Sequence, residues 1–366
     1  MTNRASRKAA VALAAISVLL VSAHVPGEPP EYYLQDWSTR DLGYFGDQGQ
    51  WQETRALCAR VADAVPPAAD LPTAADRAAL KGCSSEALYY GIGTMRDPSA
   101  ARKCAFLEIE RNMGETRSTL ATPFEFFDAH GMLAVIYANG TGAERDLDLA
   151  LHAACRLEHA PMAMESRIRH LDRLRSEGPG DEPFSICDDI TSGISMGICA
   201  GHFARVAQQE RKGWLQEWEA GWTQQQRGLF AAAYESFAAY AEISHELDCF
   251  RGTMAAACSI SGTERDVQDF LERLEALVAH RPLPRRERVE EGDVTRDTGA
   301  RPATATQEEF SQILEGLDTH EAEVHLANQR NAIAARKVFE PRLIAFLKSV
   351  RPDLTSRQVR VLFRDL

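Results

Sequence analysis

The sequence lacks the patterns that identify the commonest metal and nucleotide enzymes. It has no H-E-x-x-H helix motif and no phosphate-binding glycine loop with a lysine. No two cysteines have the C-x2-C spacing, so a zinc knuckle is not indicated. The adjacent acids Asp188-Asp189 and Glu290-Glu291 have no accompanying feature that suggests acid–base catalysis. We therefore expect a protein that is not an enzyme and that has neither a bound metal nor a cofactor.

Basic residues are also scarce. The chain of 366 residues has 41 Lys and Arg against 53 Asp and Glu, a formal net charge of −12. Nucleic-acid binding depends on neutralising phosphates with basic side chains, so this balance argues against a nucleic-acid partner. The composition is rich in alanine and poor in β-branched residues, which favours helices over strands. We expect an all-α fold in two or three domains.

The apolar run near the N-terminus, Ala9–Val21, is short for a membrane span, which needs about 20 residues. Three basic residues precede it and small residues follow at 21–23, which is the pattern of a secretory signal. We interpret residues 1–23 as a signal peptide and 24–48 as an extended leader, with an uncleaved anchor as the alternative. A periplasmic or secreted protein without membrane contact after cleavage is expected.

The stretch Gly131–Cys155 predicts a helical hairpin. A helix that starts at Thr122–Glu125 would end at Gly140 and Gly142, because glycine tolerates the left-handed geometry of a tight turn. Asp146 would then cap the second helix.

An imperfect copy of this hairpin lies upstream, in Ala87–Ala105. Its Gly91, Gly93 and Asp97 have the same spacing as the downstream turn residues. The pattern resembles the Sel-one-like repeat, a relative of the tetratricopeptide repeat, over roughly Thr73–Cys155. The resemblance implies a short α/α solenoid, in which each hairpin buries its apolar face against a neighbour.

Two hairpins are few for a solenoid, so further helices must cover them. We expect Gln50–Ala64 to cover the hairpins before and Pro161–Arg175 to cover them after, which gives a repeat domain over 49–175. The polar, Gly- and Pro-rich stretch Ser176–Pro183 predicts the end of that domain.

Export gives the cysteines a role, because an oxidising compartment favours disulfides. The eight cysteines are Cys58, Cys83, Cys104, Cys155, Cys187, Cys199, Cys249 and Cys258. Four lie before Cys187 and four from it onward, so two bridges in each half is the simplest pattern. In the first half, turn symmetry suggests Cys83–Cys104, which leaves Cys58–Cys155. Cys58–Cys83 with Cys104–Cys155 is the competing pattern.

Residues 184–280 predict a second, disulfide-linked helical hairpin domain. The expected helices are Cys199–Gln226, Gly228–Leu247 and Thr263–Val278. The start of the first helix in a hairpin meets the end of the second. This argument favours Cys199–Cys249 and leaves Cys187–Cys258.

The cysteine frame of this region is similar to the lysozyme inhibitor LprI-like domain, over about 187–277. The frame runs C-x11-C, long helix, helix ending in Cys, glycine loop, Cys, amphipathic helix. Glu210 falls near the acidic position of the family's first helix, and Trp214 near its aromatic position. The family's Gln-Arg-x-x-Trp and Arg-Asp patterns are replaced by Ala238, Ala239, Ala241, His245 and Glu246. The resemblance implies a secreted or periplasmic binding role, with inhibition of a lysozyme as its sharpest form.

The candidate binding residues are Trp214, Trp218, Trp222, Glu210 and Glu217. The three tryptophans recur at four-residue spacing and form one stripe, which could be a binding hot spot or part of the core. Residues 184–280 contain 14 acidic and seven basic residues, a net charge of −7. This charge would speed the encounter with a cationic lysozyme, or it could simply maintain solubility.

The remaining chain is interpreted as a linker over 281–306 and C-terminal helices over 307–366. Pro341 predicts a kink or break, and Thr355 with Gln358 forms a capping box for a last helix. These helices could form a third domain, or they could complete the second one.

Three functions are open at this point. The first is an exported, non-enzymatic protein that binds another protein, with a cationic lysozyme-type hydrolase as the sharpest candidate. The second is a repeat scaffold with an open groove along Tyr89, Tyr90 and Tyr137. The third is a cell-wall hydrolase, which would need a cleft with two facing acids.

Overall fold

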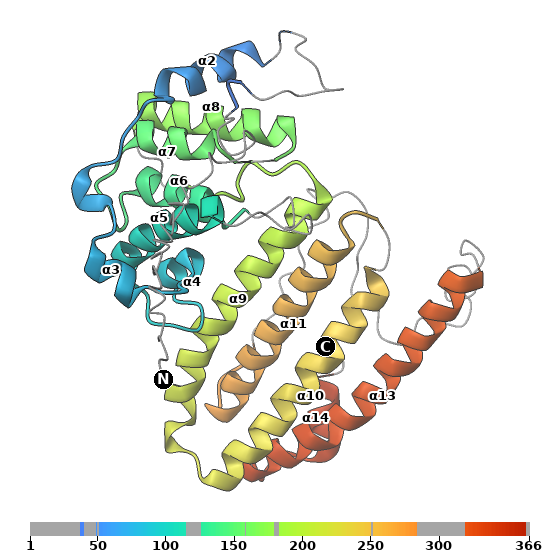
Figure 1. Cartoon of the computed structure of the whole chain (residues 1–366). Coiled ribbons are helices and arrows are strands. Elements are labelled where there is room, and N and C mark those ends of the chain that lie inside the picture. The colour runs from blue at the N-terminus through green and yellow to red at the C-terminus, as the bar shows by residue number, and fades with distance from the viewer. Residues whose placement is uncertain are drawn as a thin grey trace, which may run out of the picture.

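The computed structural model (Figure 1) describes residues 37–39, 49, 51–114, 126–157, 159–178, 183–249, 252–283 and 319–363. Every regular element within these residues is a helix, which confirms the predicted all-α class. The α-helices are α2 (Gln52–Val61), α3 (Ala74–Ala79), α4 (Ser85–Tyr90), α5 (Pro98–Gly114), α6 (Ala129–Asn139), α7 (Leu147–Ala154), α8 (Pro161–Glu177), α9 (Gly193–Trp218), α10 (Gln224–Asp248), α11 (Ala255–Val278), α13 (Thr319–Val350) and α14 (Ser356–Leu362). The predicted signal peptide, the helix start at Thr122–Glu125 and most of the predicted linker lie outside the described residues.

Two helical hairpins, α4–α5 and α6–α7, are closed by turns of the same geometry. Gly91 and Gly140 end the first helix of each hairpin in the left-handed conformation, with φ of 78° and 64°. Asp97 and Asp146 accept backbone N–H bonds at the start of the second helix. Gly93 and Gly142 also have positive φ, of 69° and 91°. The matching arginine bonds run from Arg96 Nε to the Tyr89 carbonyl (3.0 Å) and from Arg145 Nε to the Ala138 carbonyl (2.9 Å). The turns therefore repeat as their spacing predicts.

Replacing Gly140 by valine is expected to lower the free energy of unfolding by about 1–3 kcal/mol, because a β-branched residue resists positive φ. The added Cβ would also lie 3.0 Å from Cβ of Arg145. Thermal unfolding followed by circular dichroism measures the change. Gly213→Val is the control, since Gly213 has no positive φ and no atom within 4 Å of a built Cβ. An unchanged melting curve for Gly140→Val would contradict the turn argument.

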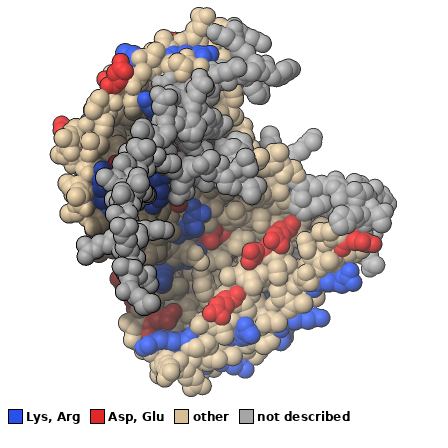
Figure 2. Space-filling model, viewed as in Figure 1, with Lys and Arg blue, Asp and Glu red and all other residues tan. Residues whose placement is uncertain are grey.

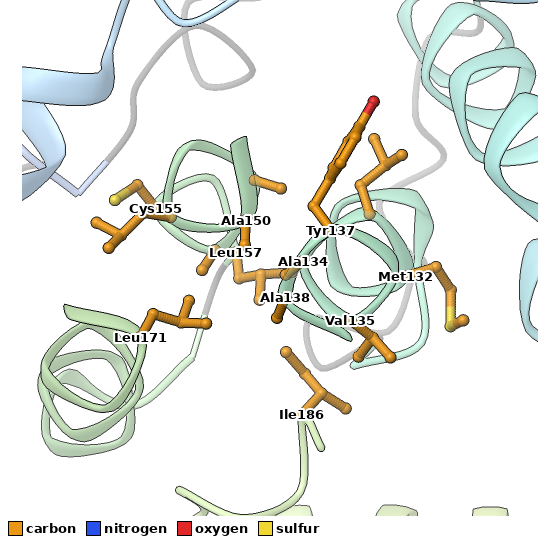
Figure 3. Packing of buried hydrophobic residues seen from close by; sticks show 14 of the residues in the cluster. Met132, Ala134, Val135, Tyr137, Ala138, Ala150, Cys155, Leu157, Leu171 and Ile186 are labelled. Atoms are coloured by element: carbon orange, nitrogen blue, oxygen red, sulfur yellow. The ribbon is translucent and has the colours of Figure 1, made fainter. Parts of the chain in front are cut away.

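The first hydrophobic core surrounds α6, which is buried along almost its whole length. Figure 3 shows Ala134 of α6 and Ala150 of α7 between their two helices, where small side chains let the backbones approach. Leu171 of α8 and Ile186 close the core from below in the same view. Asp128 is the N-cap of α6, so this helix begins later than the sequence pattern predicts.

The helix expected within Gln50–Ala64 is present as α2, and it lies beside the helix expected within Pro161–Arg175, which is α8. Helix α2 packs against α7 and α8, at the same end of the hairpins as α8 itself (Figure 1). The Cys58–Cys155 disulfide holds it there. Trp37, from the predicted leader, also joins this core: its backbone N–H donates to the Cys155 carbonyl, and its indole donates to Thr54.

Cys83–Cys104 accompanies Cys58–Cys155, so the first half has the pairing suggested by turn symmetry. In the second half the favoured pairing is wrong: the disulfides are Cys187–Cys199 and Cys249–Cys258. The physical reason is helix order, because α11 lies between α9 and α10 (Figure 1) and packs against both. The start of α9 therefore meets the start of α11 and not the end of α10.

The second hydrophobic core is built by α10, α11, α13 and α14. Its buried members are Phe230, Ala233, Phe237, Tyr240, Ala241, Val267, Phe270, Leu271, Leu274, Leu277, Phe339, Leu343, Phe346, Leu347, Val359 and Phe363. The C-terminal helices thus complete this core, which decides between the two arrangements left open by the sequence. Pro341 lies inside α13 without ending it, and the capping box of Thr355 and Gln358 is formed.

Helix α9 belongs to both cores. Phe184, Ile186, Cys187 and Cys199 lie in the first core, beyond the predicted domain boundary, whereas the tryptophans at the other end of α9 pack on the second. Two of its glycines face α11 closely, since a Cβ on Gly193 or Gly197 would meet Thr253 or Ala256. One continuous helix therefore contributes to both hydrophobic cores.

Candidate functional site

The predicted tryptophan stripe is largely structural. Trp214 stacks on Trp218 with ring centroids 5.1 Å apart, and Trp218 contacts Trp222 edge-on at 4.6 Å. Trp222 then contacts Phe230 and Phe346 of the second core. All three tryptophans are half-buried, and the stripe leads from the core at Trp222 outward to Trp214.

Trp214 is also a wall of a pocket of 630 Å³ between the C-terminal halves of α9 and α11. The pocket is lined by Ala207, Glu210, Arg211, Trp214, Gln268, Leu271, Glu272, Glu275, Ala276, Arg281 and Pro282. On the face formed by α9, α11, α10 and α13, Figure 2 shows acidic side chains across the middle and basic ones along the lower edge. An aromatic wall beside several carboxylates is suited to binding a polar, cationic guest.

The charges of the pocket are only partly balanced. Arg211 pairs with Glu264 at 2.6 Å, and Arg281 pairs with Glu275 at 2.8 Å. Glu272 accepts a hydrogen bond from the neutral Gln268 amide at 2.8 Å. Glu210 forms no ion pair within the part of the chain that the structure describes.

The structure thus brings together two of the five candidate binding residues, Glu210 and Trp214. Glu217 is exposed on the same helix but does not line the pocket. The sequence reading missed Arg211 and the contribution of α11. A signal was present, because Gln268, Leu271, Glu272 and Glu275 recur at three- and four-residue spacing and so share one helix face.

The groove expected for a repeat scaffold is not open at the predicted tyrosines. Tyr89 and Tyr137 are buried, and Tyr137 donates to Asp70 at 3.0 Å. Tyr90 packs edge-on against His202 of α9 at 4.4 Å. Helix α9 therefore covers this side of the hairpins.

His202 is the centre of that contact. It is buried, stacks on Phe127 at 3.7 Å, and donates from Nδ1 to Glu86 at 2.7 Å. Burial acts to raise the pKa of Glu86, but hydrogen bonds from His202 and Arg205 outweigh it and lower that pKa. The pair joins the two halves of the molecule.

Residues 193–197 have the G-x-S-x-G pattern of a nucleophile elbow, but not its structure. An elbow places its serine exposed on a strand-to-helix turn. Ser195 is instead buried in the first turn of α9, and its hydroxyl is 2.6 Å from that of Ser192. The segment starts a helix and does not present a nucleophile.

Other site types have little support in the described part of the chain. No group of three or more His, Cys, Asp or Glu side chains is placed to hold a metal ion there. None of the helices described combines the length and apolar character that a bilayer crossing requires. Burial raises the pKa of Glu219, but Glu219 does not line the pocket.

In comparisons with known proteins, no protein-family model, no curated protein and no solved structure matches this chain. The resemblances to Sel-one-like repeats and to the LprI-like domain therefore stay predictions from the residues that carry them.

Proposed function

We propose that this is an exported, non-enzymatic binding protein that contacts a protein partner through the face of α9 and α11. The observation that carries the proposal is the pocket in which Glu210 and Trp214 lie beside Glu272. Four disulfides account for all eight cysteines, and disulfides persist in oxidising compartments. Together with the signal-like N-terminus, they support a periplasmic or secreted location.

The partner class that best suits this face is a cationic protein. Residues 184–280 have a net charge of −7, and opposite charge increases association rates. A lysozyme-type hydrolase is the sharpest candidate, because the cysteine frame resembles the LprI-like domain. The repeat-scaffold alternative has less support, since α9 covers the face along Tyr90.

The test is a titration of the oxidised protein, without residues 1–23, into a lysozyme lysis assay. The whole mature chain is needed, because Cys199 belongs to the first core and the second core is completed by α13 and α14. A shorter piece over 184–280 would expose parts of both hydrophobic cores to solvent.

We expect dose-dependent inhibition that weakens as salt rises from about 50 to 300 mM, because salt screens charge attraction between exposed groups. Lysozyme assayed without the binding protein at each salt concentration is the control for salt effects on the enzyme. Inhibition that is independent of salt would contradict the electrostatic account. Absence of inhibition by the folded protein would contradict the choice of lysozyme as partner.

A further inference from the structure

We propose that the pocket between α9 and α11 binds one basic side chain, an arginine or a lysine, presented by the partner protein. This inference rests on the proposed function, since it states what the acidic face recognises. The basic group would lie against Trp214, with Glu210 and Glu272 as its carboxylate partners.

Two carboxylates remain for a guest after the internal ion pairs of the pocket are formed. The cations Arg211 and Arg281 are paired with Glu264 and Glu275. Among the described residues, neither Glu210 nor Glu272 pairs with a cation. A cationic donor adds charge attraction to the hydrogen bonds that it gives to these carboxylates, so a guest that brings a positive charge gains most here.

The pocket already accommodates a guanidinium group of its own chain. Arg281 follows the end of α11 and places its guanidinium 2.8 Å from Glu275 at the pocket wall. A second guanidinium or an ammonium group can use Glu210 and Glu272 in the same manner. The face of Trp214 adds a cation–π contact, for which tryptophan is the best of the aromatic side chains.

Arg211 lies in the pocket wall and does not neutralise Glu210 or Glu272. Its side chain is only 9% exposed, its guanidinium pairs with Glu264 at 2.6 Å, and its Nε–H is enclosed by the protein. A saccharide could also stack on Trp214 and donate hydroxyl hydrogen bonds to the two carboxylates, but it is neutral and gains no charge attraction from them.

The experiment titrates N-acetyl-arginine amide into the oxidised mature protein and follows the indole N–H signals by NMR. The Trp214 signal is assigned by its loss in Trp214→Phe. We expect this signal to shift in a saturable way, whereas N-acetyl-citrulline amide, the neutral analogue of the same shape, leaves it in place. Glu210→Gln and Glu272→Gln should each weaken binding by about 2- to 5-fold, as expected for partly exposed ion pairs.

Glu217→Gln is the matched control, because Glu217 is an exposed acid of the same helix outside the pocket. It should bind arginine amide as the parent does. Equal binding of the citrulline and arginine compounds would overturn the proposal, and so would a Trp214 shift caused by an N-acetylglucosamine oligosaccharide but not by arginine amide.

The outcomes also separate this inference from the proposed function. Lysozyme inhibition without any response of Trp214 to arginine amide would reject the pocket and keep the function. A saturable, charge-dependent Trp214 response without lysozyme inhibition would keep the pocket and reject lysozyme as the partner.

Discussion

Replacing Cys58 and Cys155 together by alanine is expected to lower the free energy of unfolding by about 4–5 kcal/mol. The disulfide joins residues 97 apart in sequence, and a crosslink that closes a loop of about 100 residues removes roughly that much chain entropy from the unfolded state. Both cysteines are fully buried. Alanine is therefore chosen over serine, whose hydroxyl would be left unsatisfied in the core. Chemical denaturation under non-reducing conditions, followed by circular dichroism, measures the loss.

The matched control is the double replacement of Cys249 and Cys258 by alanine. Their separation is 9 residues, for which the same relation gives roughly 2.5–3 kcal/mol. The Cys58–Cys155 variant should therefore be the less stable of the two. Equal losses would contradict the view that loop length sets the effect. A smaller loss for Cys58–Cys155 would show that α2 is held on α7 mainly by packing.

The features that the sequence predicts correctly are local ones. The turns at Gly91 and Gly140 depend on residues within a few positions of each other, because positive φ and helix capping are decided over a single turn. The capping box of Thr355 and Gln358 is a similar case. Arg96 and Arg145 lie inside the same spacing, one residue before each capping Asp, and could have been found by comparing the residues between the second Gly and the Asp of the two turns.

The errors concern contacts between elements that are distant in the chain. The pairing Cys199–Cys249 assumed that successive helices are spatial neighbours, but α11 lies between α9 and α10. A signal for that arrangement was present in Gly193, Gly197 and Gly201, whose four-residue spacing makes one smooth strip on α9. The sequence does not show which helix packs on this strip, because many helices contain small residues.

The candidate site shows the same difference between local features and contacts between distant elements. The sequence identified Glu210 and Trp214, which lie on one helix, but not Glu272, which comes from α11 and reaches the pocket only through the packing of two helices. From the sequence, the stripe of tryptophans was open between the core and a binding surface. The structure assigns Trp222 to the core and leaves Trp214 at the pocket.

Replacing Phe346 by alanine is expected to lower the free energy of unfolding by about 3–5 kcal/mol, the usual cost of removing a buried phenylalanine ring. Phe346 of α13 is fully buried and lies 5.2 Å from Trp222 and 5.3 Å from Phe230, measured between ring centroids. Deletion of the ring leaves a cavity at the point where α13 meets the tryptophan stripe. Urea denaturation of the mature protein, monitored by tryptophan fluorescence, measures the effect.

Val338→Ala is the control on the same helix, because Val338 is 47% exposed and its truncation should change stability by no more than about 0.5 kcal/mol. Equal stability of the two variants would mean that α13 does not support the second core and that the tryptophan stripe is held by α9 and α10 alone. The predicted difference has a consequence for binding. Since Trp214 stacks on Trp218, and Trp218 contacts Trp222 edge-on, loosening the stripe at Phe346 should also weaken the arginine-amide response at the pocket, although Phe346 does not line it.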